Sequence, residues 1–276
     1  MHGAHQVTDF LKSQASAHMH IAVNIFDGEH LECGRALHAS GASRVTYVPG
    51  FKTLFWKQVL TPNITASYDL IWLLDCDLRI TPHLFTISEV EYWLETTGAS
   101  IIQPSVVPHQ HNGRGGRGAL TRAGFSADCI ARAVPHIEQM TPIFRRASFD
   151  VLWKALSRIP DERLGSDSGL ETLWCGLAVL HFADWPACIA LSHMSVIHLN
   201  THTIHRYDKQ ERAHYFNQKV NLLPYLNENF STEMQAARLR ATTIARELGN
   251  IHTSSKNGTY AETLRKSQVC WGIPAG

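Results

Sequence analysis

The chain has 276 residues, which is enough for one large domain or a domain with an appendage and excludes a multidomain assembly. Hydrophobic residues make up 44% and charged residues 18%, a balance that excludes a disordered chain. The 25 Lys and Arg nearly equal the 24 Asp and Glu, and the net charge of +1 argues against a dedicated binder of nucleic acid. The 17 histidines are unusual, because histidine often serves as a metal ligand or proton carrier.

Extended and helical patterns alternate along the chain. The predicted strands are residues 20–26, 44–48, 69–74, 100–107, 137–144 and 187–198. The predicted helices are residues 7–14, 52–60, 88–96, 147–157, 169–180, 206–218 and 233–248. Ser88 is the expected N-cap of its helix, and Gly98 is the expected C-terminal stop. This order predicts an α/β fold in which a mostly parallel sheet is flanked by helices.

The residue pattern changes at about residue 206, where charged helical runs replace the alternation of extended and helical segments. We therefore expect one domain over residues 1–205, a helical appendage packed on it over 206–250, and a flexible tail over 251–276. No apolar stretch has the length of a membrane-spanning helix, and no signal-peptide core follows the first residues.

The six cysteines are scattered and include no CxxC pair, a distribution that favours buried free thiols over a disulfide framework. Asn63, Asn229 and Asn257 begin Asn-X-Ser/Thr sequons, where roughly one or two would occur by chance. These sequons are a faint indication of a secretory lumen.

The best candidate site is the pair Asp75 and Asp77, directly after the apolar run of residues 69–74. A continuous apolar run is typical of a strand buried on both faces, and carboxylates two positions apart on extended backbone point to the same side. At the carboxyl end of a parallel strand they would face the crevice in which α/β proteins bind ligands. Two such oxygen donors suit Mg²⁺ or Mn²⁺ shared with a diphosphate. The plainer alternative is a pair of solvated turn carboxylates.

Two further groups of residues are candidates. His198 ends the last predicted strand, so its imidazole could complete the shell of the same ion, whereas His193, His202 and His205 fit a polar surface loop better. Asp167 and Glu171 stand at a helix start, where a carboxylate could act as general base on an acceptor hydroxyl. Their plainer roles are an N-cap and a first-turn acid favoured by the helix dipole.

A glycine-rich loop, residues 113–118, formally matches the GxGxxG pattern of dinucleotide-binding proteins. That pattern must follow a strand directly and open a helix, but residues 108–112 intervene here and the loop itself carries two arginines. A mobile basic loop that closes over a phosphate-bearing ligand is therefore the preferred interpretation. A dinucleotide-dependent oxidoreductase remains an alternative.

Taken in order, these blocks resemble the glycosyltransferase-like family catalogued as domain of unknown function 707, which is frequent in plants and algae. The central block is Tyr68-Asp-Leu-Ile-Trp-Leu-Leu-Asp75-Cys-Asp77. The other matching blocks are residues 26–28, Lys52, 55–56, 102–104, 137–144, Trp153, 169–171 and 196–198. The family looks like a GT-A-type, DxD-containing nucleotide-sugar transferase.

The resemblance implies roles for individual residues. Asp75 and Asp77 would hold a divalent ion on the donor diphosphate, with His198 as a further metal ligand. Glu171 would be the catalytic base, with Asp167 as its substitute. The weaker candidates for the donor pocket are Lys52, Gln103 and Glu138.

The chain departs from the family in two places. The family usually has Asp where this chain has Glu171, and the first strand of a GT-A core is not found ahead of the helix at residues 7–14. Relatives often carry a membrane anchor upstream, which would place those relatives in the Golgi or secretory pathway. No such anchor is found in this sequence.

The sequence therefore predicts a glycosyltransferase that uses Mn²⁺ or Mg²⁺ to move a sugar from a nucleotide-sugar donor to an acceptor hydroxyl, on a glycan or another molecule. No nucleic-acid partner is expected. The first alternative is a catalytically inactive relative that keeps the fold as a binding or scaffold protein, and the second is the oxidoreductase based on residues 113–118.

Overall fold

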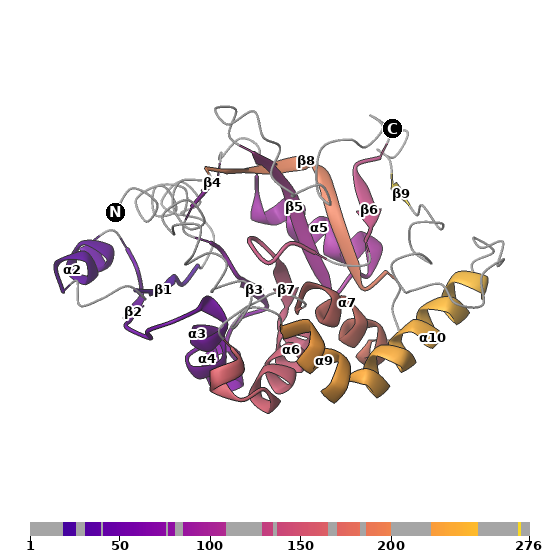
Figure 1. Ribbon diagram of the computed structural model, residues 1–276. Coiled ribbons are helices and arrows are strands. Elements are labelled where there is room, and N and C mark those ends of the chain that lie inside the picture. The colour runs from indigo at the N-terminus through magenta and orange to yellow at the C-terminus, as the bar shows by residue number, and fades with distance from the viewer. Residues whose placement is uncertain are drawn as a thin grey trace.

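The computed structural model shows an α/β architecture, with a twisted central sheet and helices packed against it (Figure 1). The residues that the structure describes are 19–25, 31–39, 41–75, 77–80, 85–108, 129–134, 137–164, 170–182, 186–199, 222–247 and 270–271. The predicted helix at residues 7–14, the one at 206–218 and the loop at 113–118 lie outside these ranges.

The strands confirm most of the predicted extended segments. They are β1 (Ala22–Asn24), β2 (Arg44–Thr46), β3 (Leu70–Trp72), β4 (Leu78–Ile80), β5 (Ile101–Pro108), β6 (Ala131–Ala133), β7 (Ile143–Arg145), β8 (Cys188–His198) and β9 (Cys270–Trp271). The helices are α2 (Leu31–Ala39), α3 (Lys52–Gln58), α4 (Pro62–Thr65), α5 (Ile87–Thr97), α6 (Arg146–Arg158), α7 (Leu170–His181), α9 (Leu222–Asn229) and α10 (Ser231–Glu247), with a short 3₁₀ turn at Asp161–Arg163. The domain limits proposed from sequence texture stay a prediction.

The central sheet has seven strands in the described part of the chain, in the order β3-β7-β5-β8-β6-β9, and β4 pairs with β8 beside this path. The strands β1 and β2 form a separate parallel pair. Within the central sheet, β5 and β8 are parallel, and the other described pairs are antiparallel. The sheet is therefore mixed, and the expectation of a mostly parallel sheet is wrong in that detail.

The mixed order has a simple physical reason. The strands β3 and β5 are both antiparallel to β7, which lies between them, so β3, β5 and β8 all run in one direction. Alternating strands and helices correctly predicted that shared direction. An apolar run does not reveal its own direction, however, so the insertion of β7 could not be seen from the pattern of hydrophobic residues.

Apolar side chains fill both faces of the central sheet. Along β5, Ile101 packs on one side and Ile102 on the other, because successive side chains of a strand point to opposite faces. The first side is covered by α3, α6, α7 and α9, whose largest fully buried rings are Phe149 and Trp174. The second side is covered by α5, through Val90, Trp93 and Leu94. Burial on both faces explains the continuous apolar run that marks β3 in the sequence.

Helix α10 packs closely on α7 beside Gly176, where an added Cβ atom would make ordinary van der Waals contact. A Cβ atom on Gly176 would lie 3.4 Å from the sulfur of Met234 and 3.5 Å from the Cβ of Ala237. The packing of α9 and α10 beneath α7 is visible in Figure 1. None of the helices in the described part of the chain combines the length and apolar composition that a bilayer span requires.

Helix α5 begins and ends at residues that favour those positions. Thr86, not Ser88, is its N-cap, and the Thr86 side chain accepts a hydrogen bond from the amide of Glu89. The expected N-cap was therefore wrong by two residues, because Ser and Thr satisfy the same requirement. Gly98 ends the helix in the left-handed conformation with φ 69°, as predicted.

The structure corrects the expectation of free thiols. Cys175 of α7 and Cys188, the first residue of β8, form a disulfide with a Cα–Cα distance of 5.7 Å, and both residues are fully buried. Cys129 is also disulfide-bonded. No sequence pattern indicated the Cys175–Cys188 bond, because only the packing of α7 against the sheet brings these two residues together.

Candidate functional site

A charged group of side chains, Lys52, Asp75, Asp77 and His198, lies where β3 and β8 end, and we call it the charged edge. Lys52 opens α3 and donates to both carboxylate oxygens of Asp75, at 2.9 and 3.0 Å. The same Nζ lies 3.4 Å from the carbonyl of Gln139. About a quarter of each partner's side chain is exposed, 25% for Lys52 and 24% for Asp75. The sequence nominated both residues as ligands of a donor but did not predict that they pair with each other.

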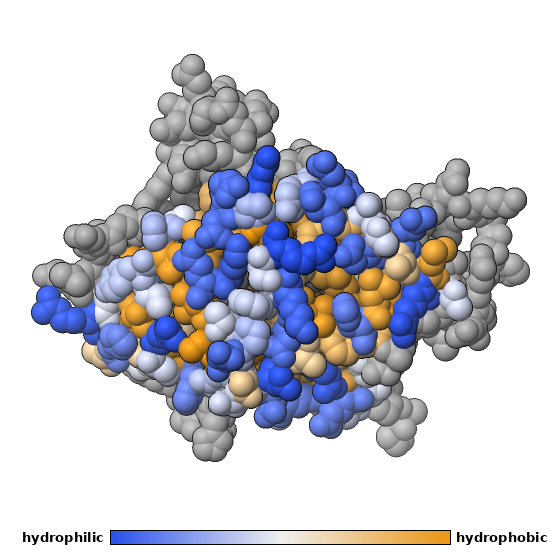
Figure 2. Space-filling model, turned by 90° about the horizontal axis from the view of Figure 1, so that it is seen from below, coloured by the Kyte–Doolittle hydropathy of each residue, from blue (hydrophilic) through white to orange (hydrophobic). Residues whose placement is uncertain are grey.

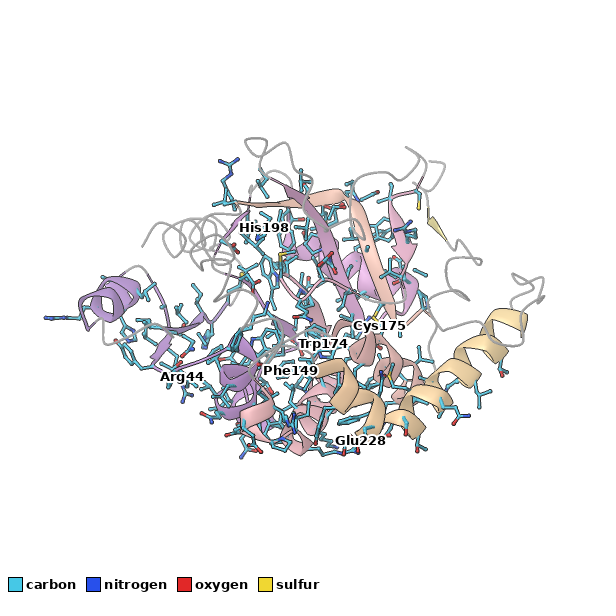
Figure 3. All side chains as sticks on the ribbon, in the orientation of Figure 1. Arg44, Phe149, Trp174, Cys175, His198 and Glu228 are labelled. Carbon is cyan, nitrogen blue, oxygen red and sulfur yellow. A yellow bond between two sulfur atoms is a disulfide. The ribbon has the colours of Figure 1, made fainter. Side chains whose placement is uncertain are left out.

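The second ion pair of the charged edge joins Asp77 to His198. The antiparallel register of β4 and β8 places Leu78 opposite His198, and the amide of Leu199 donates to the carbonyl of Asp77 at 2.9 Å. This pairing brings His198 Nε2 to 3.0 Å from Asp77 Oδ2. Figure 3 shows His198 at the upper side of the sheet, at the opposite end from Trp174 and Phe149.

The two partners shift each other's pKa values. The hydrogen bond to Asp77 raises the pKa of His198 against the opposing effect of burial, and the negative charges of Asp75 and Glu138 add to the rise. Burial favours the neutral form of Asp77, but the hydrogen bond and charge of His198, with a smaller contribution from Lys52, hold its pKa below the usual value. The charged forms of both side chains are therefore favoured while they face each other.

A short stretch of backbone, residues 138–142, holds this region together, and we call it the bracing segment. Each of its five residues forms at least one hydrogen bond to the site or to the strands beneath it. The amide of Glu138 donates to the side chain of Gln103, and the carbonyl of Gln139 accepts from the side chain of Lys52. The carbonyls of Met140 and Pro142 accept from the amides of Asp75 and Leu73, and the hydroxyl of Thr141 accepts from the indole of Trp72. Sequence reasoning missed this role, because four of the five bonds use backbone atoms, which leave no mark on residue type.

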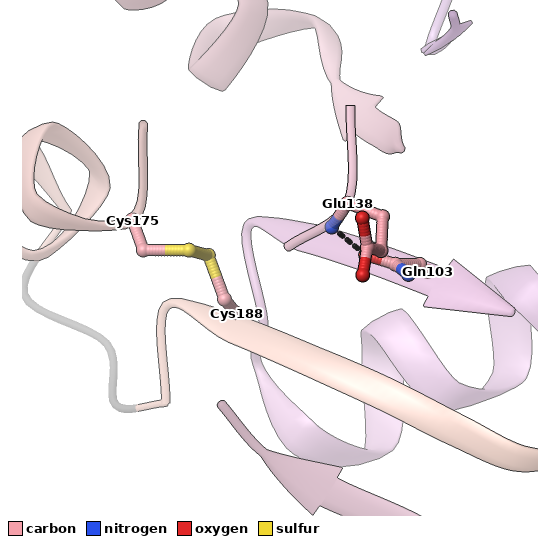
Figure 4. Close-up of a disulfide and its surroundings, with 4 residues drawn as sticks. All are labelled: Gln103, Glu138, Cys175 and Cys188. Carbon is pink, nitrogen blue, oxygen red and sulfur yellow. Dashed lines mark hydrogen bonds between the residues drawn. A yellow bond between two sulfur atoms is a disulfide. The ribbon is translucent and has the colours of Figure 1, made fainter. Parts of the chain in front are cut away.

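Gln103 is the buried end of this arrangement. It lies on β5 with no exposed surface, and its side-chain oxygen accepts the hydrogen bond from Glu138 at 2.5 Å. Figure 4 shows this bond beside the strand that begins at Cys188. The other side-chain atom, Nε2, has no hydrogen-bond partner among the described residues. An orphan donor of this kind is costly to bury, so Gln103 is a candidate to bind an acceptor atom.

Glu171, the predicted base, is the second residue of α7, a position where the helix dipole favours a negative charge. Its side chain lies outside the described atoms. Asp167 lies outside the described residues, as do His202 and His205. His193 contacts Glu89 of α5, away from the charged edge.

The described residues contain no group of three or more His, Cys, Asp or Glu side chains close enough to hold a metal ion. Asp75 faces Lys52, and Asp77 faces His198, so each predicted carboxylate ligand already has a basic partner. The metal assignment stays a prediction.

No protein-family model matches this chain, and no curated protein matches it. Among solved structures, the chain is similar to S. aureus TarS 1–349 in complex with UDP-GlcNAc. The sequence identity is 14%, the TM-score is 0.48, and the match covers 90% of this chain and 69% of that chain. A likeness of this strength says nothing about activity. The resemblance to the family of domain 707 also stays a prediction.

Proposed function

We propose that this chain is a GT-A-like glycosyltransferase that moves a sugar from a nucleotide-sugar donor to an acceptor hydroxyl. The observation that carries the proposal is the charged edge, where Lys52, Asp75, Asp77 and His198 meet although they come from separate elements. Ligands of α/β proteins bind outside the carboxyl ends of the strands, and both β3 and β8 end here. The group therefore lies where a donor would bind, with both signs of charge available to it.

The donor's diphosphate would bind against Lys52 and the two aspartates. In the structure, Lys52 neutralises Asp75, so binding of a phosphate would require the ammonium to exchange one carboxylate contact for a phosphate oxygen. Asp75 would then be released to face a cation. The bracing segment would hold the backbone of Asp75 in place during this exchange, because the amide of Asp75 donates a hydrogen bond to the carbonyl of Met140.

A divalent cation fits this donor set. Mg²⁺ and Mn²⁺ prefer carboxylate oxygens, and they often use only one or two protein carboxylates together with phosphate oxygens and water. The lack of a cluster of three protein ligands among the described residues is compatible with that arrangement. When bound, the ion would neutralise charge on the departing diphosphate. Asp75 and Asp77 would hold it, and His198 would orient Asp77 or replace it as a ligand.

The acceptor hydroxyl would need a base on the other side of the donor sugar. Glu171 is our first candidate and Asp167 its substitute, on the sequence argument alone. Because α7 also carries Cys175, four residues after Glu171, the disulfide ties this helix to the start of β8. The cross-link would thereby help to fix the position of Glu171 relative to the strand that ends at His198.

One observation favours a second candidate, a binding or scaffold protein without catalysis. Both aspartates of the charged edge are already neutralised by protein side chains, so the site is electrostatically satisfied without any ion. A protein of this kind would bind neither nucleoside diphosphate nor Mn²⁺ at the charged edge.

A calorimetric titration with UDP and GDP, each with and without Mn²⁺, separates the two candidates. A donor-hydrolysis screen over nucleotide sugars with Mn²⁺ then tests catalysis. We expect binding that depends on Mn²⁺, at least tenfold weaker in Asp75→Asn and in Asp77→Asn. The matched control is Asp161→Asn, because Asp161 is an exposed aspartate paired with Lys57 elsewhere on the surface. Unchanged affinity in both site variants would refute the assignment, and no nucleotide binding at all would favour the scaffold protein.

A further inference from the structure

The first sequon, Asn63-Ile64-Thr65, lies on the short helix α4, and its asparagine is exposed. Ile64 beside it is 40% exposed. Thr65 is buried, with its hydroxyl close to the carbonyl of Thr61 at 3.3 Å. The asparagine that would carry a glycan is therefore accessible, whereas the Thr65 hydroxyl that completes the sequon is hydrogen-bonded to the backbone.

In the second sequon, the side chain of Asn229 is already hydrogen-bonded within the fold. Asn229 is exposed at the end of α9, but its side-chain Nδ2 donates to the carbonyl of Tyr225 at 2.9 Å. Its backbone carbonyl also accepts from Arg158 at 3.4 Å. For the Asn63 side chain, no hydrogen bond to another described residue competes with a glycan. The third sequon, at Asn257, lies outside the described residues.

The disulfides carry an independent argument about the compartment in which the chain folds. Cys175 and Cys188 are bonded and fully buried, and Cys129 is disulfide-bonded as well. Structural disulfides form and persist in oxidising compartments such as the secretory lumen and are rare where thiols are kept reduced. That lumen is also where Asn-X-Ser/Thr sequons receive glycans, which are bulky and hydrophilic and sit on the surface.

We propose that Asn63 is an N-glycosylation site, modified in the same oxidising compartment in which Cys175 and Cys188 are joined. The position suits a glycan, because α4 lies at the lower side in Figure 1, whereas His198 lies at the upper side in Figure 3. A glycan on α4 would leave the charged edge open. It would also cover the exposed side chain of Ile64. Figure 2, which views the molecule from below, shows apolar side chains between hydrophilic ones on that face.

The test uses the full chain, produced with a secretory leader in cultured eukaryotic cells. Peptide N-glycosidase treatment and peptide mass mapping measure occupancy at Asn63, and non-reducing mapping identifies the molecules that contain the Cys175–Cys188 bond. We expect Asn63→Gln to remove one glycan and Thr65→Ser to retain it, because serine keeps the sequon hydroxyl. The matched control is Asn227→Gln, which changes an exposed asparagine outside any sequon and should leave the glycan pattern unchanged.

The proposal would be overturned if Asn63 stayed unmodified in secreted molecules that contain the Cys175–Cys188 bond. It would also be overturned if Asn63→Gln left the number of glycans unchanged. Because Asn63 is exposed, its replacement by glutamine should not prevent folding, and the presence of the disulfide in the variant checks this directly. Neither outcome depends on whether the chain transfers a sugar.

Discussion

Two regions on the same sheet are held together by different forces. At the junction of α7 with the sheet, the buried rings of Phe144 in β7 and Trp174 in α7 lie 5.3 Å apart, and the Cys175–Cys188 disulfide joins α7 to β8. At the charged edge, ion pairs between partly exposed side chains take the place of apolar contacts. Burial of apolar side chains stabilises the junction strongly. Ion pairs in contact with water stabilise the charged edge only weakly. Under the proposed function, this difference would let the charged edge exchange its partners for a ligand while the junction stays packed.

The largest expected effect belongs to the junction. Phe144→Ala would remove a fully buried ring that contacts Phe149 and Trp174 at centroid distances of 5.8 and 5.3 Å. Deleting a buried Phe side chain costs about 3–5 kcal/mol, because it removes apolar contacts and leaves a cavity. Unfolding in urea measures this loss of free energy. The control is Tyr92→Ala, because the Tyr92 side chain is 46% exposed and should change stability by no more than about 0.5 kcal/mol. Equal losses in both variants would contradict the contrast between the regions.

The disulfide should have the next largest effect. Replacing both Cys175 and Cys188 by alanine opens a loop whose ends are 13 residues apart in the sequence, and we expect a loss of about 2–4 kcal/mol. The same urea experiment measures it. A reductant should then lower the stability of the native chain by more than that of the double variant, since the variant has no bond left at this position. If the double variant unfolded at the same urea concentration as the native chain, the junction would not depend on its cross-link.

The smallest of these effects is expected at the charged edge. Lys52→Met leaves the carboxylate of Asp75 without its ammonium partner, and we expect a loss of about 1 kcal/mol, since both side chains are partly in water. Adding Asp75→Asn to the same chain should recover part of that loss, which a double-mutant cycle measures as a coupling energy. The comparison pair is Lys57 with Asp161, where the aspartate is 51% exposed and the coupling should be smaller. A larger coupling in the exposed pair would reverse our ranking.

The sequence predicted many elements of this fold correctly. The helices α5, α6 and α7 begin and end within two residues of their predicted limits, because each has a clear apolar period and recognisable ends. The sequence did not predict β4 and β6, each of three residues. In the structure, the strand predicted at 137–144 is only β7, Ile143–Arg145. Most of residues 137–142 serves the bracing segment instead, and its use of backbone hydrogen bonds does not depend on side-chain pattern.

The sequence also predicted part of the candidate site. It nominated Asp75, Asp77 and His198 as neighbours, and the structure brings His198 into contact with Asp77. It did not foresee that Lys52 pairs with Asp75, because the two residues are 23 positions apart and carry no shared motif. The roles of all these residues in binding and catalysis stay predictions that the proposed experiments test.

The sequence alone determined where this protein is apolar, where its helices end and which carboxylates follow a buried strand, because these properties depend on local residue type and spacing. Only the tertiary structure decided that β7 lies between β3 and β5, that Cys175 meets Cys188, and that each aspartate of the charged edge has a basic partner. Those facts join residues far apart in the chain, so they depend on how packed elements fit together. The pattern within any one segment does not contain that information.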